Sequence, residues 1–348
     1  MRKVIITFVH LGEYPSPYLW TNIEQLIERF PKNEVALIYD TETFVKNRSI
    51  PGLKLHKYER VESDQKVLGK QQVPMSFRSG YWRFTLERFL ALHDFHERNT
   101  SAGILHIESD VLLLPGVPFE LISSWVNLMW CPCDDDRDVG SLLYSPTPES
   151  SRWLKEKILE TIDSTGFITD MVILRRIAMR FPNAVGYFPT EFDQTNRDEI
   201  NDFGIFDGAA IGLWLTGIDP RNYYGVTRIR DTKTISNAGT NIEPWKSTYS
   251  YSPNDGLFQK SSNVEVRIWN LHIHSKNLKL LGAEWESELI KYVHATKKVS
   301  MTTEFNLTIF KDLIKTNYQQ GQLIRFLLGH RFFSPLHRAK RIISRKPI

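Results

Sequence analysis

The sequence predicts an α/β protein whose central sheet is mostly parallel and flanked by helices. A β-branched run at residues 4–9 suits a buried parallel strand, and residues 19–30 follow with apolar side chains at helical spacing. A second apolar run, at residues 35–39, ends at Asp40. This strand–helix–strand order opens a doubly wound sheet, which binds its ligands beyond the carboxyl ends of its strands.

Two loops near these first strands are candidate nucleotide contacts. His10 begins the loop beyond the first predicted strand and stands where a nucleotide rim is expected, although an ordinary connecting loop explains it equally well. Arg78 precedes an amphipathic helix for which Ser79 is a plausible N-cap. A helix N-terminus beside an arginine suits a diphosphate, and a plain surface arginine is the alternative.

The stretch from Gly103 to Pro115 is a buried strand that runs into two acidic residues. Glu108 and Asp110 flank Ser109, so an extended backbone points both carboxylates to the same side. Carboxylates at the end of an apolar strand are costly unless they meet water, a partner or a metal ion. The sequence therefore predicts a functional site beyond this strand.

Two further acidic residues open helices in the second half of the chain. Asp170 stands at the predicted N-cap of a helix at residues 171–180, after a strand at residues 139–144 that contains a glycine. Asp207 caps the start of a later helix. Small residues let that helix pack tightly against a neighbour or a ligand: Gly208, Ala209, Ala210 and Gly212.

Alternating residues from Val264 to Ile273 predict a strand that ends in His272, His274 and Lys276. All three project to one side, where they can supply an imidazole for a metal and a cation for a phosphate. A pair of histidines with a structural role is the alternative.

Composition limits the class of function. The 348 residues are 41% hydrophobic and 12% aromatic with a net charge of +4, which indicates a globular protein and gives no sign of nucleic-acid binding. Cys131 and Cys133 are too few for a zinc site and are interpreted as reduced thiols. Since no segment reaches the ~18 apolar residues that span a bilayer, we expect a cytoplasmic protein.

The composition shifts near residue 320. Beyond it the chain is basic, without an acidic residue, and interleaved with apolar side chains. This pattern suits the anionic inner face of a membrane, as a peripheral contact. A packed C-terminal helix and a disordered basic tail are the alternatives.

Taken together, these motifs resemble metal-dependent glycosyltransferases of the GT-A fold. An acid-x-acid motif, here Glu108-Ser-Asp110, is followed by strand, helix, acid and helix, and then by a distant histidine. The resemblance implies that Asp110 binds Mn²⁺ or Mg²⁺ and that Glu108 approaches the ribose or the metal. It also implies that a histidine completes the metal shell, with His274 as the first choice and His272 as the second.

The resemblance further implies transfer of a hexosyl group from a nucleotide-diphosphate sugar to a glycan or lipid-linked acceptor, as in polysaccharide biosynthesis. Asp170 matches the acid near the acceptor and is the first choice for a general base, with Asp207 second; a retaining enzyme needs neither. Arg78 and Lys276 neutralise phosphate charge. Segments such as His-Ile-Glu-Ser-Asp and Asn-Leu-His-Ile-His-Ser-Lys also look like those of a group of microbial glycosyltransferase-like proteins.

We expect a GT-A domain at residues 1–276, a helical extension that packs on it at 277–320, and the basic amphipathic tail at 321–348. Two other functions fit part of the pattern. A sugar-phosphate nucleotidyltransferase would carry a glycine-rich phosphate loop after the first strand, where this chain has His10-Leu-Gly-Glu-Tyr-Pro. A catalytically silent binding protein of the same fold would not need to keep both acids and the histidine.

Overall fold

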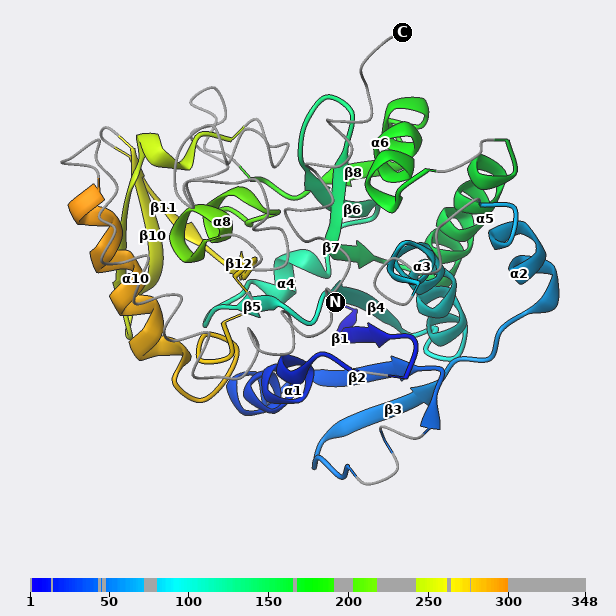
Figure 1. Cartoon of the computed structure of the whole chain (residues 1–348), viewed down its shortest axis with the longest axis horizontal. Helices are drawn as coiled ribbons and strands as arrows, with labels where there is room; N and C mark the ends of the chain where they lie inside the picture. Colours follow the sequence, from blue (N-terminus) through cyan, green and yellow to red (C-terminus); the bar gives the residue numbers. More distant parts are fainter. Residues whose placement is uncertain are drawn as a thin grey trace, which may run out of the picture.

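The computed structural model (Figure 1) describes residues 2–13, 15–42, 45, 48–71, 80–164, 168–190, 203–217, 242–261, 264–275 and 277–299. Arg78, Ser79, Lys276 and the basic tail at 321–348 lie outside these residues, as does most of the second half of the predicted extension.

The first half of the chain forms β1 (Lys3–His10), α1 (Pro17–Arg29), β2 (Glu34–Tyr39), β3 (Leu53–Lys57), α2 (Glu62–Leu68), α3 (Tyr81–Glu97), β4 (Ala102–Ile107), β5 (Val111–Leu113) and α4 (Phe119–Ile122). The rest forms β6 (Leu128–Pro132), β7 (Asp138–Ser145), α5 (Pro148–Ser164), α6 (Asp170–Arg180), β8 (Val185–Tyr187), α8 (Ala210–Thr216), η5 (Pro244–Lys246), β9 (Thr248–Ser252), β10 (Gly256–Ser261), β11 (Val264–Ile268), β12 (Asn270–His272) and α10 (Trp285–Val299).

A seven-stranded sheet forms the centre, in the order β3-β2-β1-β4-β7-β6-β8. Neighbouring strands are parallel except at β7, which runs antiparallel to both β4 and β6. Strands β1, β2 and β4 are apolar on both faces because helices cover both sides. The predicted mostly parallel α/β sheet, flanked by helices, is confirmed.

Alternate residues of the strands enter two separate cores. Ile5 of β1 packs with α3, α5 and α6, whereas Ile6 and Phe8 pack with α1 on the opposite face. Figure 1 shows these helix layers to the right and left of the sheet. In a doubly wound sheet of this kind, ligands bind beyond the carboxyl ends of the parallel strands, between the two helix layers.

A smaller antiparallel sheet, β9-β10-β11, lies beside the main one and carries α10 (Figure 1). The single strand predicted at residues 264–273 is instead two strands, β11 and β12, separated by Trp269. Strand β12 pairs antiparallel with β5, and His272 stands opposite Val111. This pairing brings a residue from the distant C-terminal half next to the acidic pair.

Two predicted helix starts differ in detail. Helix α3 begins at Tyr81, and its N-cap position is Gly80, whose φ of 92° glycine adopts readily; the predicted cap, Ser79, lies outside the described residues. Helix α6 is capped by Thr169, whose side chain accepts from the Val172 amide, and Asp170 is the first helical residue. None of the described helices is long and apolar enough to cross a membrane.

Candidate metal centre

The acidic pair lies in a tight turn between β4 and β5. The Glu108 amide donates to the carbonyl of Ser141 on β7 (2.8 Å), and the Val111 amide donates back to the Glu108 carbonyl (3.0 Å). From α1, the buried Asn22 side chain donates to the carbonyls of Ser109 (3.0 Å) and Val111 (2.9 Å). Three elements therefore fix the backbone on which both carboxylates stand.

His272 meets this pair through the β5–β12 pairing. Its Nε2 lies 3.3 Å from Asp110 Oδ2 and 3.6 Å from Glu108 Oε2. The three ligand atoms lie within 4.8 Å of one another. The side chains of Asp110 and His272 are almost buried, and that of Glu108 is 26% exposed, so the group is accessible from one side.

The hydrogen bonding of His272 leaves Nε2 as the ring atom that could bind a metal ion. Nδ1 lies 2.8 Å from the Gly208 carbonyl oxygen, which only accepts, so Nδ1 carries the proton and donates. In the neutral ring, the lone pair of Nε2 then faces the carboxylates. A carbonyl that holds the far nitrogen in this way is the usual support of a metal-bound imidazole.

The donor set and its spacing fit a divalent ion. Two carboxylate oxygens and one imidazole nitrogen suit Mn²⁺ or Mg²⁺. Ligand atoms at right angles around an ion that binds them at ~2.1–2.3 Å are roughly 3 Å apart. The 3.3 and 3.6 Å separations come close to that spacing and exceed a typical N–H···O bond.

The buried carboxylate of Asp207 accepts hydrogen bonds from α8 and from the strand that carries His272. Its Oδ1 accepts from the Ile211 amide (2.9 Å) in the first turn of α8, although the N-cap position itself is Ala209 and not Asp207 as predicted. Its Oδ2 accepts from the amides of Gly212 (2.7 Å) and His272 (2.9 Å). Burial raises the pKa of Asp207, and these hydrogen bonds oppose the rise. The carboxylate thus joins the start of α8 to β12.

A small residue of α8, Gly212, allows the helix to lie close to β12. A Cβ on Gly212 would lie 2.1 Å from the carbonyl oxygen of His272, so only glycine allows this approach. Asn270 adds a second link, because its side chain donates to the Asp207 carbonyl (2.8 Å) and accepts from the Asp207 amide (3.0 Å). The close neighbour of the glycine is therefore the strand that carries His272.

Arg88 connects the acidic pair to Asp170. It lies in the middle of α3, and its guanidinium donates to Glu108 Oε1 and to Asp170 Oδ2, the latter at 2.7 Å. Burial lowers the pKa of Arg88, but the two carboxylates outweigh it and hold the pKa above its usual value. Gly140 of β7 makes the room, since a Cβ there would lie 3.0 Å from Arg88 Nη2.

Asp170 is buried at the first residue of α6. Burial raises its pKa, and Arg88 opposes that rise. The glycine-containing strand β7 and the acid that opens α6, both singled out in the sequence, thus meet at the guanidinium of Arg88. Arg88 could not be identified from the sequence, because it belongs to no motif and its role depends on partners from other segments.

The remaining predicted residues lie around this centre or outside the described chain. The ring of His274 stacks on that of His272, with centroids 4.2 Å apart, and it is not one of the three grouped ligands. His10 ends β1 beside Asp40, whose carboxylate accepts from the Gly12 amide (2.9 Å). Burial lowers the pKa of His10, and Asp40 opposes this.

Among known proteins, solved structures of low sequence identity resemble part of this chain. No protein-family model matches the chain, and no curated protein matches it. The solved structures that resemble part of it include PaToxG glycosyltransferase, with 9% identity over 52% of this chain and 70% of that one (TM-score 0.35). Mouse xyloside xylosyltransferase 1 has 11% identity over 57% of this chain and 90% of its own (TM-score 0.36). The glycosyltransferase GlyE of Streptococcus pneumoniae has 16% identity over 53% of this chain and 44% of its own (TM-score 0.34).

Proposed function

We propose that the chain is a glycosyltransferase of the GT-A type. It transfers a hexosyl group from a nucleotide-diphosphate sugar to a glycan or lipid-linked acceptor. The observation that carries this proposal is the meeting of Glu108, Asp110 and His272 at the carboxyl edge of a mostly parallel sheet. Ligands of such sheets bind at that edge, and a diphosphate needs a cation there.

The proposed metal ligands are Asp110, Glu108 and His272. His272 takes the place that the sequence favoured for His274, because its Nε2 faces both carboxylates and its Nδ1 is held by Gly208. The ring of His274 packs against the ring of His272. A bound Mn²⁺ or Mg²⁺ ion would stabilise the negative charge that develops on the diphosphate leaving group.

The donor is proposed to lie between this centre and the carboxyl end of β1. His10 stands at that end, and Arg78 and Lys276 remain the proposed cations for the phosphates. Glu108 reaches toward the ribose or the metal, and Arg88 fixes its orientation through one half of its guanidinium. Arg88 is thus a positioning residue, since it acts through the two carboxylates that it holds.

On the acceptor side we propose Asp170 as the catalytic carboxylate. As a base it must be ionised, so activity should rise with pH as Asp170 loses its proton. In a retaining enzyme the same carboxylate would orient the acceptor. Asp207, the second candidate, has both oxygens occupied by three backbone amides, and we propose that it positions His272 instead.

The experiment is a metal-dependent transfer and hydrolysis assay with UDP-, GDP- and CMP-sugars. Asp110→Asn should reduce turnover at least ~100-fold and weaken Mn²⁺ binding, because it removes a charged ligand. Asp255→Asn, a change of the same kind in the exposed β9–β10 turn, should alter neither. Absence of nucleotide binding by the native chain with Mn²⁺ or Mg²⁺ present would instead favour a silent protein of this shape.

We further propose that the chain works in the cytoplasm, with domains at 1–276 and 277–320. In this proposal the basic tail at 321–348 contacts the anionic inner face of a membrane, where lipid-linked acceptors for polysaccharide synthesis would be met. Sedimentation with anionic vesicles before and after truncation at residue 320 tests the tail. Equal sedimentation of the two forms would remove the membrane contact from the proposal.

A further inference from the structure

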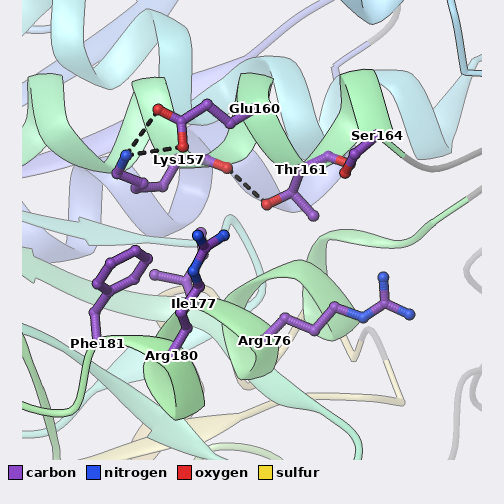
Figure 2. A pocket seen from close by; sticks show the side chains of 8 residues that line it. All are labelled: Lys157, Glu160, Thr161, Ser164, Arg176, Ile177, Arg180 and Phe181. Carbon is purple, nitrogen blue, oxygen red and sulfur yellow. Dashed lines mark hydrogen bonds and ion pairs between the residues drawn. The ribbon is translucent and has the colours of Figure 1, made fainter.

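A groove with about 330 Å³ of space lies between the C-terminal halves of α5 and α6 (Figure 2). Its lining residues are Lys157, Glu160, Thr161, Ser164, Arg176, Ile177, Arg180 and Phe181. This volume is at the lower end of the range found for small-molecule sites. Asp170 begins α6 and Arg180 ends it, roughly 15 Å apart along the helix axis, so the groove is separate from the metal centre.

The groove holds two arginines that form no ion pair with a carboxylate of the described residues. Arg176 and Arg180 are one turn apart on α6, and in the described part of the chain neither makes a hydrogen bond or an ion pair. Like charges at this spacing destabilise a helix. Arg180 is in the last turn, where a cation complements the helix dipole, but Arg176 lies before that turn. The dipole therefore accounts for only one of the two.

The opposite wall does not compensate for these charges. Lys157 of α5 donates to both carboxylate oxygens of Glu160, at 2.7 and 2.8 Å, as the dashed lines in Figure 2 show. The one acidic side chain of the lining is thus already bound to a cation on its own helix. An incoming anion would meet the guanidinium groups of α6 with no carboxylate of α6 competing for them.

One end of the groove is apolar and aromatic. The Phe181 ring has Lys157 Nζ 5.6 Å and the Arg180 guanidinium carbon 5.3 Å from its centroid. Trp153 packs against the same ring edge-on, at 5.3 Å between centroids, and fixes its orientation. The two cations thus lie over this ring, and Phe181 supplies an apolar wall beside the charges that an anionic group would meet.

The geometry points to a binding site for a phosphate monoester on a sugar-sized carrier. Guanidinium groups donate paired hydrogen bonds to phosphate oxygens. The two groups point to different places along the groove in Figure 2, and a turn of the exposed Arg176 side chain would let both reach one phosphate. The CH face of a sugar ring suits an aromatic side chain, and the volume admits a molecule of this size. The site is independent of the proposed transfer reaction.

The test is calorimetric titration of the full chain at low salt with glucose 6-phosphate, inorganic phosphate and glucose. We expect glucose 6-phosphate to bind, inorganic phosphate to bind more weakly, and glucose not to bind. The double variant Arg176→Gln/Arg180→Gln should lose about tenfold or more in affinity, because two charge-assisted hydrogen bonds are removed. Arg98→Gln, a change at an exposed arginine that ends α3, should bind as the native chain does.

Asp110→Asn separates this site from the metal centre. Unchanged binding of glucose 6-phosphate by that variant is expected, whether or not the chain proves to be a transferase. Equal affinity of the double variant and the native chain, with circular dichroism showing both folded, would overturn the proposal. Binding of glucose as tight as that of its phosphate would overturn it too, and inorganic phosphate binding equally well would overturn the role of Phe181.

Discussion

Helix α3 sends two neighbouring residues into two different networks of charge. Glu87 faces Arg60, which lies between it and Asp40 with bonds of 2.6 Å to each, while Gln65 donates to Glu87 at 2.8 Å. Arg88, about 100° further round the helix, faces Glu108 and Asp170. The first network is closed by short hydrogen bonds between opposite charges.

The second network is not closed in the same way. Glu108 Oε2 and Asp110 Oδ2 lie 3.6 and 3.3 Å from the Nε2 atom of His272, whereas the bond from Arg60 Nε to Glu87 Oε1 is 2.6 Å. A closed network stabilises a fold, whereas acids spaced around an imidazole suit a cation between them. The comparison teaches that buried charge alone does not mark a site; the spacing of the ligand atoms does.

The largest expected effect is at Arg88. Arg88→Met leaves Glu108 and Asp170 without their shared cation, and we expect a loss of about 3–5 kcal/mol in the free energy of unfolding. Urea unfolding measures this. Because the change removes no metal ligand, Mn²⁺ should still bind to folded protein while kcat falls about 100-fold through misplaced carboxylates.

Arg88→Lys keeps the charge but loses the fork that reaches both acids, so it should recover stability more than kcat. Recovery of both to native values would show that charge alone matters there. Loss of Mn²⁺ binding in folded Arg88→Met would place Arg88 within the metal site itself and break the distinction drawn above.

Glu87→Gln is the matched change in the closed network. Its side chain is fully buried, but Arg60 is partly exposed and keeps Asp40 as a partner. We expect about 1–3 kcal/mol less stability, with kcat and Mn²⁺ affinity of the folded enzyme unchanged. A drop in kcat comparable to that of Arg88→Met would mean that the two networks act as one.

The sequence predicted the residues that belong to local patterns. The acid pair ends a strand, and Asp207 precedes a run of small residues, so both could be found from neighbours in the chain. Alternation places His272 and His274 on one side, but β12 ends at His272 and the chain turns there, with the His274 amide on the His272 carbonyl (3.0 Å). Which imidazole faces the acids depends on that turn.

Residues whose role depends on distant partners could not be predicted. In the sequence, Arg88 is one more charge on an amphipathic helix. Its role follows from Asp170, 82 positions later, which packs beside it only in the folded chain. Asn22 is likewise an ordinary polar residue of α1 in the sequence, and its role follows from its contact with the turn at Ser109 in the folded chain. Each is buried because another segment satisfies its hydrogen bonds, and that information lies in the tertiary structure.

The last expected effect involves no catalytic change and concerns two buried histidines, His96 of α3 and His106 of β4. Burial lowers the pKa of His96 to about 4, and burial together with Arg88 lowers that of His106 to about 3. Both rings regain a pKa near 6.5 on unfolding, so the unfolded chain binds more protons below that pH. Stability should therefore fall from pH 6.5 toward pH 4, by on the order of 2 kcal/mol for each ring.

His96→Gln can keep a donor to the Ala102 carbonyl, which the ring contacts at 2.9 Å, and removes the titration. Its unfolding free energy, measured by urea at several pH values, should fall less steeply with acid than that of the native chain. His96 lies away from the metal centre, so kcat at neutral pH should not change. An unaltered slope would mean that other groups, such as the carboxylates around Arg88, carry the acid sensitivity.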